Sequence, residues 1–244
     1  MAAVYSLLMC GRFARRSTQK ILADWFGIPL GELPWFAPTF NAAPQSTQPI
    51  VRLSRDTAGR EFLLARWGLI PPWAKDAKFG YSTFNARAEE LLSKPAFREA
   101  FKTRRCLVPA DAFYEWQRID PKTKRPYAIA LRSGEPYAFA GLWERWKPRE
   151  GPAIESFTLV TTDPNEVMEP LHNRMPVILE TGDYDRWLDP GDPARLPVDL
   201  LRPYPAEKMQ AWPVSDRVGN VRNDDPALLE EAPPEPLHQP GLFD

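Results

Sequence analysis

Cysteine and histidine are scarce in this sequence, which has two of each among its 244 residues. Cys10 and Cys106 are too few for a disulfide framework, and such a low number is typical of proteins in a reducing compartment. Neither a CxxC pair nor an HExxH motif occurs, so structural and catalytic zinc sites have no support. We therefore expect no bound metal.

Glycine-rich phosphate loops, the GxSxG nucleophile elbow and long apolar runs are also missing. The first two absences remove the support for a nucleotide cofactor and for a serine hydrolase, so we expect no cofactor. No apolar run reaches the ~18–20 residues of a membrane span, and residues 1–9 lack the features of a secretory signal. We expect a cytoplasmic protein with no membrane partner.

Large apolar side chains are abundant, with nine tryptophans and thirteen phenylalanines, so the chain can bury a substantial core. Strand candidates outnumber helical segments and do not alternate with them regularly. This favours an α+β fold with a mainly antiparallel, barrel-like sheet flanked by short helices. The expected strands are 48–54, 61–67, 104–109, 112–118, 126–132, 136–142, 155–162 and 175–180. The expected helices are 17–27, 86–93, 95–102, 164–171, 183–188 and 197–202.

The composition changes near residue 225. Residues 226–244 contain four acidic residues and no lysine or arginine, which leaves 31 basic against 28 acidic residues in the body. A body charge of about +3 is compatible with nucleic-acid binding, although mixed surfaces often carry such a balance. The run Ala-Pro-Pro-Glu-Pro at 232–236 favours extended chain. We expect a folded body to residue 225 and a flexible acidic, proline-rich tail over 226–244.

Cys10 would become the first residue if residues 1–9 were removed. An N-terminal cysteine can condense with an aldehyde, because its amine forms a Schiff base that its thiol closes into a thiazolidine. The reference pKa values, ~7.7–8.0 for the amine and ~8.5 for the thiol, keep both groups usable near neutral pH. The alternative is an incidental cysteine that serves packing.

Two other side chains suit proton transfer. His172 is the one histidine of the body and lies in a polar turn, where its pKa near 6.5 favours acid–base work. Glu115 lies in a strand pattern on the face of Phe113 and Gln117, and aromatic neighbours would desolvate it and raise its pKa. The alternatives are a hydrogen-bonded structural histidine and a solvated edge-strand glutamate.

Basic and polar residues next to aromatic ones form a third group. Asn85 and Arg87 precede a predicted helix start, where they could hold a phosphate or serve as a cap and a surface ion pair. Arg12 and Trp73 belong to stretches in which arginine and aromatic residues alternate, a pattern that suits single-stranded nucleic acid. Many of the tryptophans must instead belong to the core.

These segments together resemble the SOS-response-associated peptidase (SRAP) family, whose members crosslink to abasic sites in single-stranded DNA. The matching pieces occur in family order over residues 10–225. They are Cys10-Gly11-Arg12-Phe13, Phe40-Asn41-Ala42-Ala43-Pro44, Trp67-Gly68-Leu69-Ile70-Pro71-Pro72-Trp73, Asn85-Ala86-Arg87-Ala88-Glu89, Arg105-Cys106-Leu107-Val108-Pro109-Ala110, Phe113-Tyr114-Glu115-Trp116, Ala140-Gly141-Leu142-Trp143, His172-Asn173-Arg174-Met175-Pro176-Val177 and Asn220-Val221-Arg222-Asn223-Asp224-Asp225.

The resemblance implies an enzyme that shields abasic sites by a thiazolidine crosslink, with lyase and autoproteolytic activities as further expectations. It implies a role in DNA repair, a nucleoid-associated monomer and a catalytic domain over 10–225. The implied catalytic residues are Cys10, Glu115, His172 and Asn85. The implied DNA-binding residues are Arg12, Asn41, Trp73, Arg87, Trp116 and Arg174. The alternatives are a cysteine peptidase that uses Cys10 and His172, and a non-enzymatic module that binds single-stranded DNA.

The start of the chain departs from the family pattern, and its end carries a further motif. Family members usually begin Met-Cys, whereas here residues 1–8 precede Met9. We expect translation to start at Met9, or the chain to cleave itself before Cys10. At the other end, Gln239, Leu242 and Phe243 match the Gln-x-x-Leu-Phe pattern of tails that dock on the bacterial sliding clamp, which predicts the clamp as a partner. The alternative is an apolar terminus without a partner.

Overall fold

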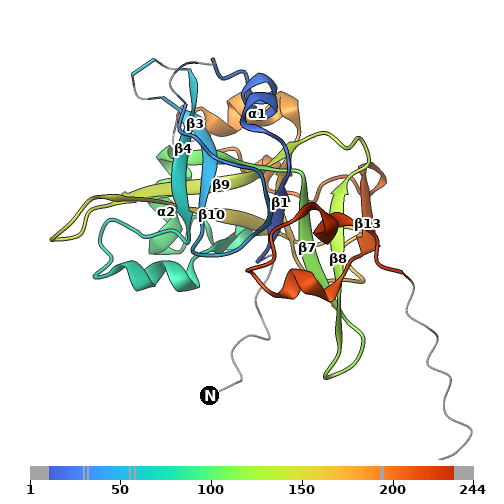
Figure 1. The fold of residues 1–244 in the computed structure, drawn as a ribbon. Coiled ribbons are helices and arrows are strands. Elements are labelled where there is room, and N and C mark those ends of the chain that lie inside the picture. Colours follow the sequence, from blue (N-terminus) through green and yellow to red (C-terminus); the bar gives the residue numbers. More distant parts are fainter. Residues whose placement is uncertain are drawn as a thin grey trace, which may run out of the picture.

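The computed structural model describes residues 11–29, 31, 33–54, 56–57, 59–192 and 195–233. Cys10, the extension over 1–9 and the predicted clamp-binding residues Gln239, Leu242 and Phe243 lie outside the described residues. The described part consists of a strand barrel joined to a second sheet, with short helices around them (Figure 1).

Five strands close into a barrel. They are β3 (Thr47–Leu53), β4 (Arg60–Trp67), β6 (Arg105–Ala110), β9 (Tyr137–Trp146) and β10 (Ile154–Thr162). The ring closes because β10 pairs with both β9 and β4, and every pair in the ring except β10–β4 is antiparallel. The expectation of an α+β fold with a mainly antiparallel, barrel-like sheet is confirmed.

The second sheet has the strand order β13-β8-β7-β1-β2. Its strands are β1 (Phe13–Arg15), β2 (Thr39–Ala42), β7 (Ala112–Arg118), β8 (Lys124–Leu131) and β13 (Met209–Pro213). Only Asp111 separates β6 from β7, so the chain passes directly from the barrel into this sheet. Asp111 is buried and accepts hydrogen bonds from the backbone N–H (2.9 Å) and the hydroxyl (2.6 Å) of Ser17.

Short elements complete the fold. The helices α1 (Gln19–Phe26), α2 (Pro95–Thr103) and α3 (Tyr184–Leu188) match three expected helices. The strands β5 (Asn85–Arg87), β11 (Met175–Pro176) and β12 (Ile178–Leu179) border the barrel. The 3₁₀ turns are Ala77–Ser82, Ala88–Glu90, Thr181–Asp183, Val198–Leu200, Ala206–Lys208, Asp216–Gly219 and Pro226–Leu229.

The helix expected over 164–171 is wrong, because this segment forms only turns. The backbone N–H groups of Met168 and Glu169 donate to the carbonyl of Asn165, which starts a helical turn. Pro170 has no N–H with which to continue that pattern. Likewise, the helices expected over 86–93 and 197–202 are only single 3₁₀ turns in the structure.

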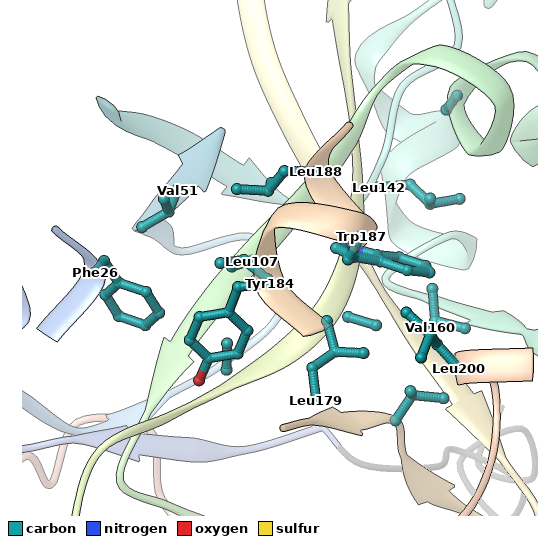
Figure 2. Close-up of a cluster of buried hydrophobic side chains, with 14 of the residues drawn as sticks. Phe26, Val51, Leu107, Leu142, Val160, Leu179, Tyr184, Trp187, Leu188 and Leu200 are labelled. Atoms are coloured by element: carbon teal, nitrogen blue, oxygen red, sulfur yellow. The ribbon is translucent and has the colours of Figure 1, made fainter. Parts of the chain in front are cut away.

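Two apolar layers hold the barrel together. Its interior contains an aromatic cluster in which Phe13 of β1 lies 5.1 Å, centroid to centroid, from Trp67 of β4. Outside, α1 and α3 cover the strands (Figure 2). The Trp187 side chain of α3 is fully buried there, and its indole N–H donates to the carbonyl of Cys106 at 2.9 Å.

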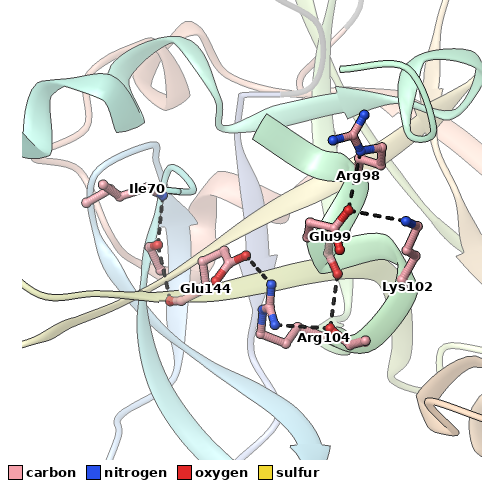
Figure 3. A network of polar contacts seen from close by, with 8 residues as sticks. Ile70, Arg98, Glu99, Lys102, Arg104 and Glu144 are labelled. Atoms are coloured by element: carbon pink, nitrogen blue, oxygen red, sulfur yellow. Dashed lines mark hydrogen bonds and ion pairs between the residues drawn. The ribbon is translucent and has the colours of Figure 1, made fainter. Parts of the chain in front are cut away.

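A polar network ties α2 to the barrel (Figure 3). Arg104, which follows α2, forms a 2.7 Å ion pair with the buried Glu144 of β9. Burial raises the pKa of Glu144, although the hydrogen bond and charge of Arg104 oppose that rise. The Ser156 hydroxyl donates to the Glu144 carbonyl (3.4 Å) and accepts from the Ile70 N–H (2.9 Å), which fixes the segment after β4.

The packed body continues beyond residue 225. Leu228 is fully buried against Tyr114 and its neighbours, the Leu229 carbonyl accepts from Trp212 Nε1 at 2.9 Å, and Glu231 forms a β-bridge with Val214. The first residues of the segment that composition assigned to a flexible tail are therefore part of the fold. No helix in the described ranges is long and apolar enough to cross a membrane.

Replacing Trp187 with alanine should lower the free energy of unfolding by about 3–5 kcal/mol, because it leaves a cavity at a fully buried position and removes the indole hydrogen bond to the Cys106 carbonyl. Urea unfolding followed by circular dichroism measures this change. Trp35→Ala is the matched control, since Trp35 is 78% exposed, and it should change stability by less than about 0.5 kcal/mol. Equal effects of the two substitutions would contradict the core assignment.

Candidate functional site

A cleft of about 1360 Å³ lies where β1 begins, between the second sheet and the end of β10. Six of the residues predicted from the sequence line it: Arg12, Arg87, Glu115, Trp116, His172 and Arg174. Gly11, which one peptide bond joins to Cys10, lines the same cleft. The fold thus gathers residues that are far apart in the sequence around the start of the described chain.

Arg12 is anchored through both its backbone and its side chain. Its carbonyl accepts from the Tyr114 N–H at 3.0 Å, which joins the start of β1 to β7. Its guanidinium donates to Asn41 Oδ1 (3.0 Å) and to the carbonyls of Val218 (2.7 Å) and Gly219 (3.3 Å). Burial lowers the pKa of Arg12, but an arginine keeps its charge at neutral pH.

Asn41 holds the wall of the cleft rather than lining it. Its side-chain amide is buried, and its Nδ2 donates to the carbonyls of Val218 (3.2 Å), Asn220 (3.1 Å) and Asn223 (2.8 Å), while its Oδ1 accepts from Arg12. Both polar atoms of the amide are therefore bonded within the protein. This geometry supports a positioning role for a residue that the resemblance assigned to DNA contact.

Glu115 enters the cleft from β7, opposite Tyr127 of β8. Glu115 is only 3% exposed. The alternation expected along this strand is confirmed, because Phe113 belongs to the aromatic cluster inside the barrel whereas Tyr114 and Trp116 pack in a separate cluster. The Arg12 guanidinium lies 6.0 Å from the centroid of the Trp116 ring, within the range of a cation–π contact.

The opposite wall comes from segments paired with β10. Arg174 Nη1 contacts Asp163 (2.8 Å), and its Nη2 contacts Glu89 (2.7 Å) and the Thr161 carbonyl (2.8 Å). Burial acts to raise the pKa of Glu89, but hydrogen bonds and the nearby guanidinium groups lower it overall. Arg87 is exposed and forms no ion pair with any described residue.

His172 lies half-buried on the same wall. Its Nδ1 accepts from the Arg174 N–H at 3.1 Å, so the neutral imidazole carries its proton on Nε2. Burial lowers the pKa of His172, and the charges of Lys124 and Arg174 act in the same direction. The neutral ring, with one N–H donor, is therefore the dominant form at pH 7.

Several lining residues were missed from the sequence. Arg118 and Lys124 reach the cleft from facing positions of the β7–β8 hairpin, and a hairpin pairing of the two predicted strands could have indicated them. Gln45 and Tyr81 also line the cleft, but Gln45 lies in a turn and Tyr81 in the short 3₁₀ turn Ala77–Ser82, and such short segments carry no periodic signal. With these residues, the cleft wall holds five cationic and three acidic side chains.

Besides Asn41, two predicted site residues within the described ranges do not line the cleft. Asn85 is half-buried at the start of β5, between two cleft residues, Phe84 and Arg87, but it does not itself line the cleft. Trp73 is 57% exposed, its ring packs edge-to-face on Phe79 at 5.1 Å, and it is not one of the residues that line the cleft. No group of three or more potential metal ligands occurs among the described residues.

Replacing Asn41 with alanine should lower the free energy of unfolding by ~2 kcal/mol, because it leaves three backbone carbonyls without their shared donor. It should also speed tryptic cleavage after Arg217 and Arg222, since the loop that carries them loses its anchor. Urea unfolding and limited proteolysis measure both effects. The control is Asn220→Ala in the same loop, where the exposed side chain holds only the Arg222 N–H. Indistinguishable behaviour of the two variants would contradict the anchoring role.

Comparisons with known proteins identify relatives of this chain. Abasic site processing protein YoqW of Bacillus subtilis is 46% identical over 228 residues, which cover 91% of this chain and 99% of that protein. Abasic site processing protein HMCES of Gallus gallus is 32% identical over 225 residues, 80% of this chain and 66% of that protein. A crystal structure of a protein from Bacteroides thetaiotaomicron matches with a TM-score of 0.82 and 26% identity, over 91% of this chain and all of that one.

The family model described as SOS response associated peptidase (SRAP) matches residues 9–221, a range that includes every wall of the cleft. Because this match extends over most of the sequence, the chain belongs to the SRAP family.

Proposed function

We propose that this protein binds abasic sites in single-stranded DNA and forms a thiazolidine crosslink through the amine and thiol of Cys10, which shields the lesion. One observation carries the proposal. Gly11, the residue bonded to Cys10, lines the same cleft as Glu115, His172 and three of the predicted arginines. The names of the relatives, which are abasic site processing proteins, support the substrate.

The proposed chemistry has two bond-forming steps. The Cys10 amine attacks the aldehyde carbon of the ring-opened sugar, and loss of one water gives a Schiff base. The thiol then adds across the C=N bond, so that carbon gains sulfur and nitrogen regains a proton. Because the second step is intramolecular, effective molarities of ~10⁵ M or more are attainable when the groups are prearranged.

Glu115 and His172 are the proposed proton carriers. We propose that the Glu115 carboxyl group, which is buried and lines the cleft, protonates the departing sugar ring oxygen and later takes a proton from the amine. The His172 Nε2–H, fixed by the contact of Nδ1, would donate to the hydroxyl that leaves as water. We also propose that Asn85 holds the open sugar once DNA is bound.

The cationic wall suits the DNA backbone. Arg12 donates only to uncharged acceptors among its described partners, and Arg87 forms no ion pair there. Both are therefore proposed contacts for the flanking phosphates. Arg174 is oriented by two carboxylates, so a phosphate would have to share its guanidinium with them. Phosphate contacts of this kind should make binding weaker as salt rises.

The crosslink is tested by mixing single-stranded DNA that bears one abasic site with a protein beginning at Cys10 and with the chain that retains residues 1–9. A covalent adduct should form with the first protein and should disappear in Cys10→Ala, because the alanine lacks the thiol. Denaturing electrophoresis and intact mass measure it. An adduct from the longer chain that lacks the mass of residues 1–9 would demonstrate self-processing.

Acetylating the amine of the Cys10-first protein supplies the matched control, since it leaves the thiol intact. The crosslinking proposal requires the adduct to vanish. A cysteine peptidase that uses Cys10 and His172 would still be acylated by a thiol-directed peptide probe, and a plain binding module would form no adduct in any version. No adduct from the unblocked Cys10-first protein would refute the proposal.

We further propose that the C-terminal residues Gln239, Leu242 and Phe243 dock on the sliding clamp. Deleting residues 239–243 should abolish clamp binding in a pull-down or by surface plasmon resonance, because the apolar pair that would fill the groove is lost. DNA crosslinking by the same deletion variant should stay unchanged. Undiminished clamp affinity after the deletion would rule the docking motif out.

A further inference from the structure

We propose that Tyr81 is a stacking platform for the base next to the abasic site and that Gln45 is the positioning residue that fixes this platform. The inference rests on the proposed function, because it assumes that the cleft receives single-stranded DNA. A strand with a missing base leaves each neighbouring base without one stacking partner. An aromatic side chain at the cleft wall can replace that partner.

Tyr81 has the exposure and the position that this role requires. It lines the cleft, and it is 59% exposed although it is aromatic. The guanidinium of Arg66 lies 5.6 Å from the centroid of its ring, and no ion pair among the described residues involves Arg66. A charged group beside one side of the ring leaves the remaining surface for a flat, uncharged partner such as a base.

Gln45 contacts both the guanidinium beside the Tyr81 ring and the backbone next to Tyr81. Its Oε1 accepts a hydrogen bond from Arg66 Nη2, and its Nε2 donates to the Gly80 carbonyl at 3.1 Å. One side chain therefore contacts the guanidinium beside the Tyr81 ring and the residue that precedes Tyr81. A change at Gln45 releases both supports together.

The backbone of Gln45 is strained. Its φ of 77° makes it the one non-glycine residue with positive φ in the described ranges. A left-handed conformation is costly for a side chain of this kind and persists where surrounding contacts enforce it, often at functional sites. Here the Gln45 N–H also donates to the Trp67 carbonyl at 2.8 Å. Three hydrogen bonds thus hold the residue in its unfavourable conformation at the edge of the cleft.

A close crossing of two glycines prevents the platform from shifting. A Cβ atom on Gly68 would lie 2.4 Å from the Gly80 carbonyl oxygen and 2.8 Å from Gln45 Nε2, so the two segments touch through their backbones. The segment that contains Gly68 is itself tied to the barrel, since Ile70 donates to Ser156. The backbone beside Tyr81 therefore packs against a segment that is hydrogen-bonded to the barrel.

The test uses single-stranded DNA with a tetrahydrofuran residue, an abasic analogue that has no aldehyde and cannot crosslink, and 2-aminopurine at one neighbouring position. The Cys10-first protein should quench the 2-aminopurine fluorescence on one side of the analogue, because that base stacks on Tyr81. Tyr81→Ala should remove the quenching and weaken binding about 5- to 100-fold. Tyr81→Phe should keep both, because the aromatic ring is retained.

Gln45→Gly separates positioning from folding. Glycine accepts positive φ without strain, so this variant should keep its melting temperature while losing the contacts to Arg66 and Gly80. It should quench less and bind more weakly than the native protein, with a smaller loss than Tyr81→Ala. Trp35→Ala, which removes a highly exposed aromatic ring outside the cleft, should change neither signal.

The outcomes distinguish the inference from the proposed function. Unchanged quenching and affinity in Tyr81→Ala would overturn the platform while leaving the crosslink proposal intact. Native behaviour of Gln45→Gly would overturn its positioning role alone. If the native Cys10-first protein neither binds the analogue nor crosslinks to a true abasic site, the proposed function itself fails, and the platform fails with it.

Discussion

Strand β10 has to satisfy hydrogen bonds along both of its edges, and the site depends on how it does so. One edge pairs with β9 and then with β11, while the other pairs with β4 and then with β5. The short strands are thereby placed at the end of β10, where β9 and β4 no longer pair with it. Because Arg87 belongs to β5 and Arg174 precedes β11, the pairing that closes the barrel also sets one wall of the cleft.

The other wall of the cleft, which includes Arg12, belongs to the second sheet. The arginines of the two walls differ in whether their hydrogen-bond partners are neutral or charged. Arg12 donates to neutral carbonyl and amide oxygens, so the protein fixes its position without neutralising it. Arg174 is fixed by the exposed carboxylates of Glu89 and Asp163, which offset its charge. Under the proposed function, an incoming phosphate would gain more from Arg12 and from Arg87, which forms no ion pair with the described residues, than from Arg174. We infer that binding is strongest beside the start of β1, where the proposed reaction takes place.

Sequence patterns predicted the elements whose structure depends on neighbouring residues, such as the alternation along a strand. The alternation along β7 correctly predicted that Glu115 and Trp116 lie on opposite faces of the strand. The long barrel strands were predicted because each is rich in apolar residues. The short strands of the second sheet were missed, since three to five residues hold too little pattern. Trp73 was predicted from the alternation of arginine with aromatic residues and from the resemblance, whereas Tyr81 was missed, and of these two rings only Tyr81 lines the cleft. The role of Asn41 depends on hydrogen bonds to carbonyls that are distant in the sequence, so no periodic pattern in the sequence could predict it.

The family resemblance identified site residues that local patterns could not, because it includes the order of motifs along the whole chain. It did not distinguish residues that would contact DNA from residues that position other side chains. Asn41 belongs to a family motif, yet both polar atoms of its amide bond to the protein, and one of them holds Arg12. This support has a chemical purpose under the proposed function. A nucleophile at a chain terminus has no residue before it to restrain it, so its positioning depends on the residues that follow. Arg12, tied to β7 by its backbone and to the loop around Val218 by its side chain, supplies that restraint.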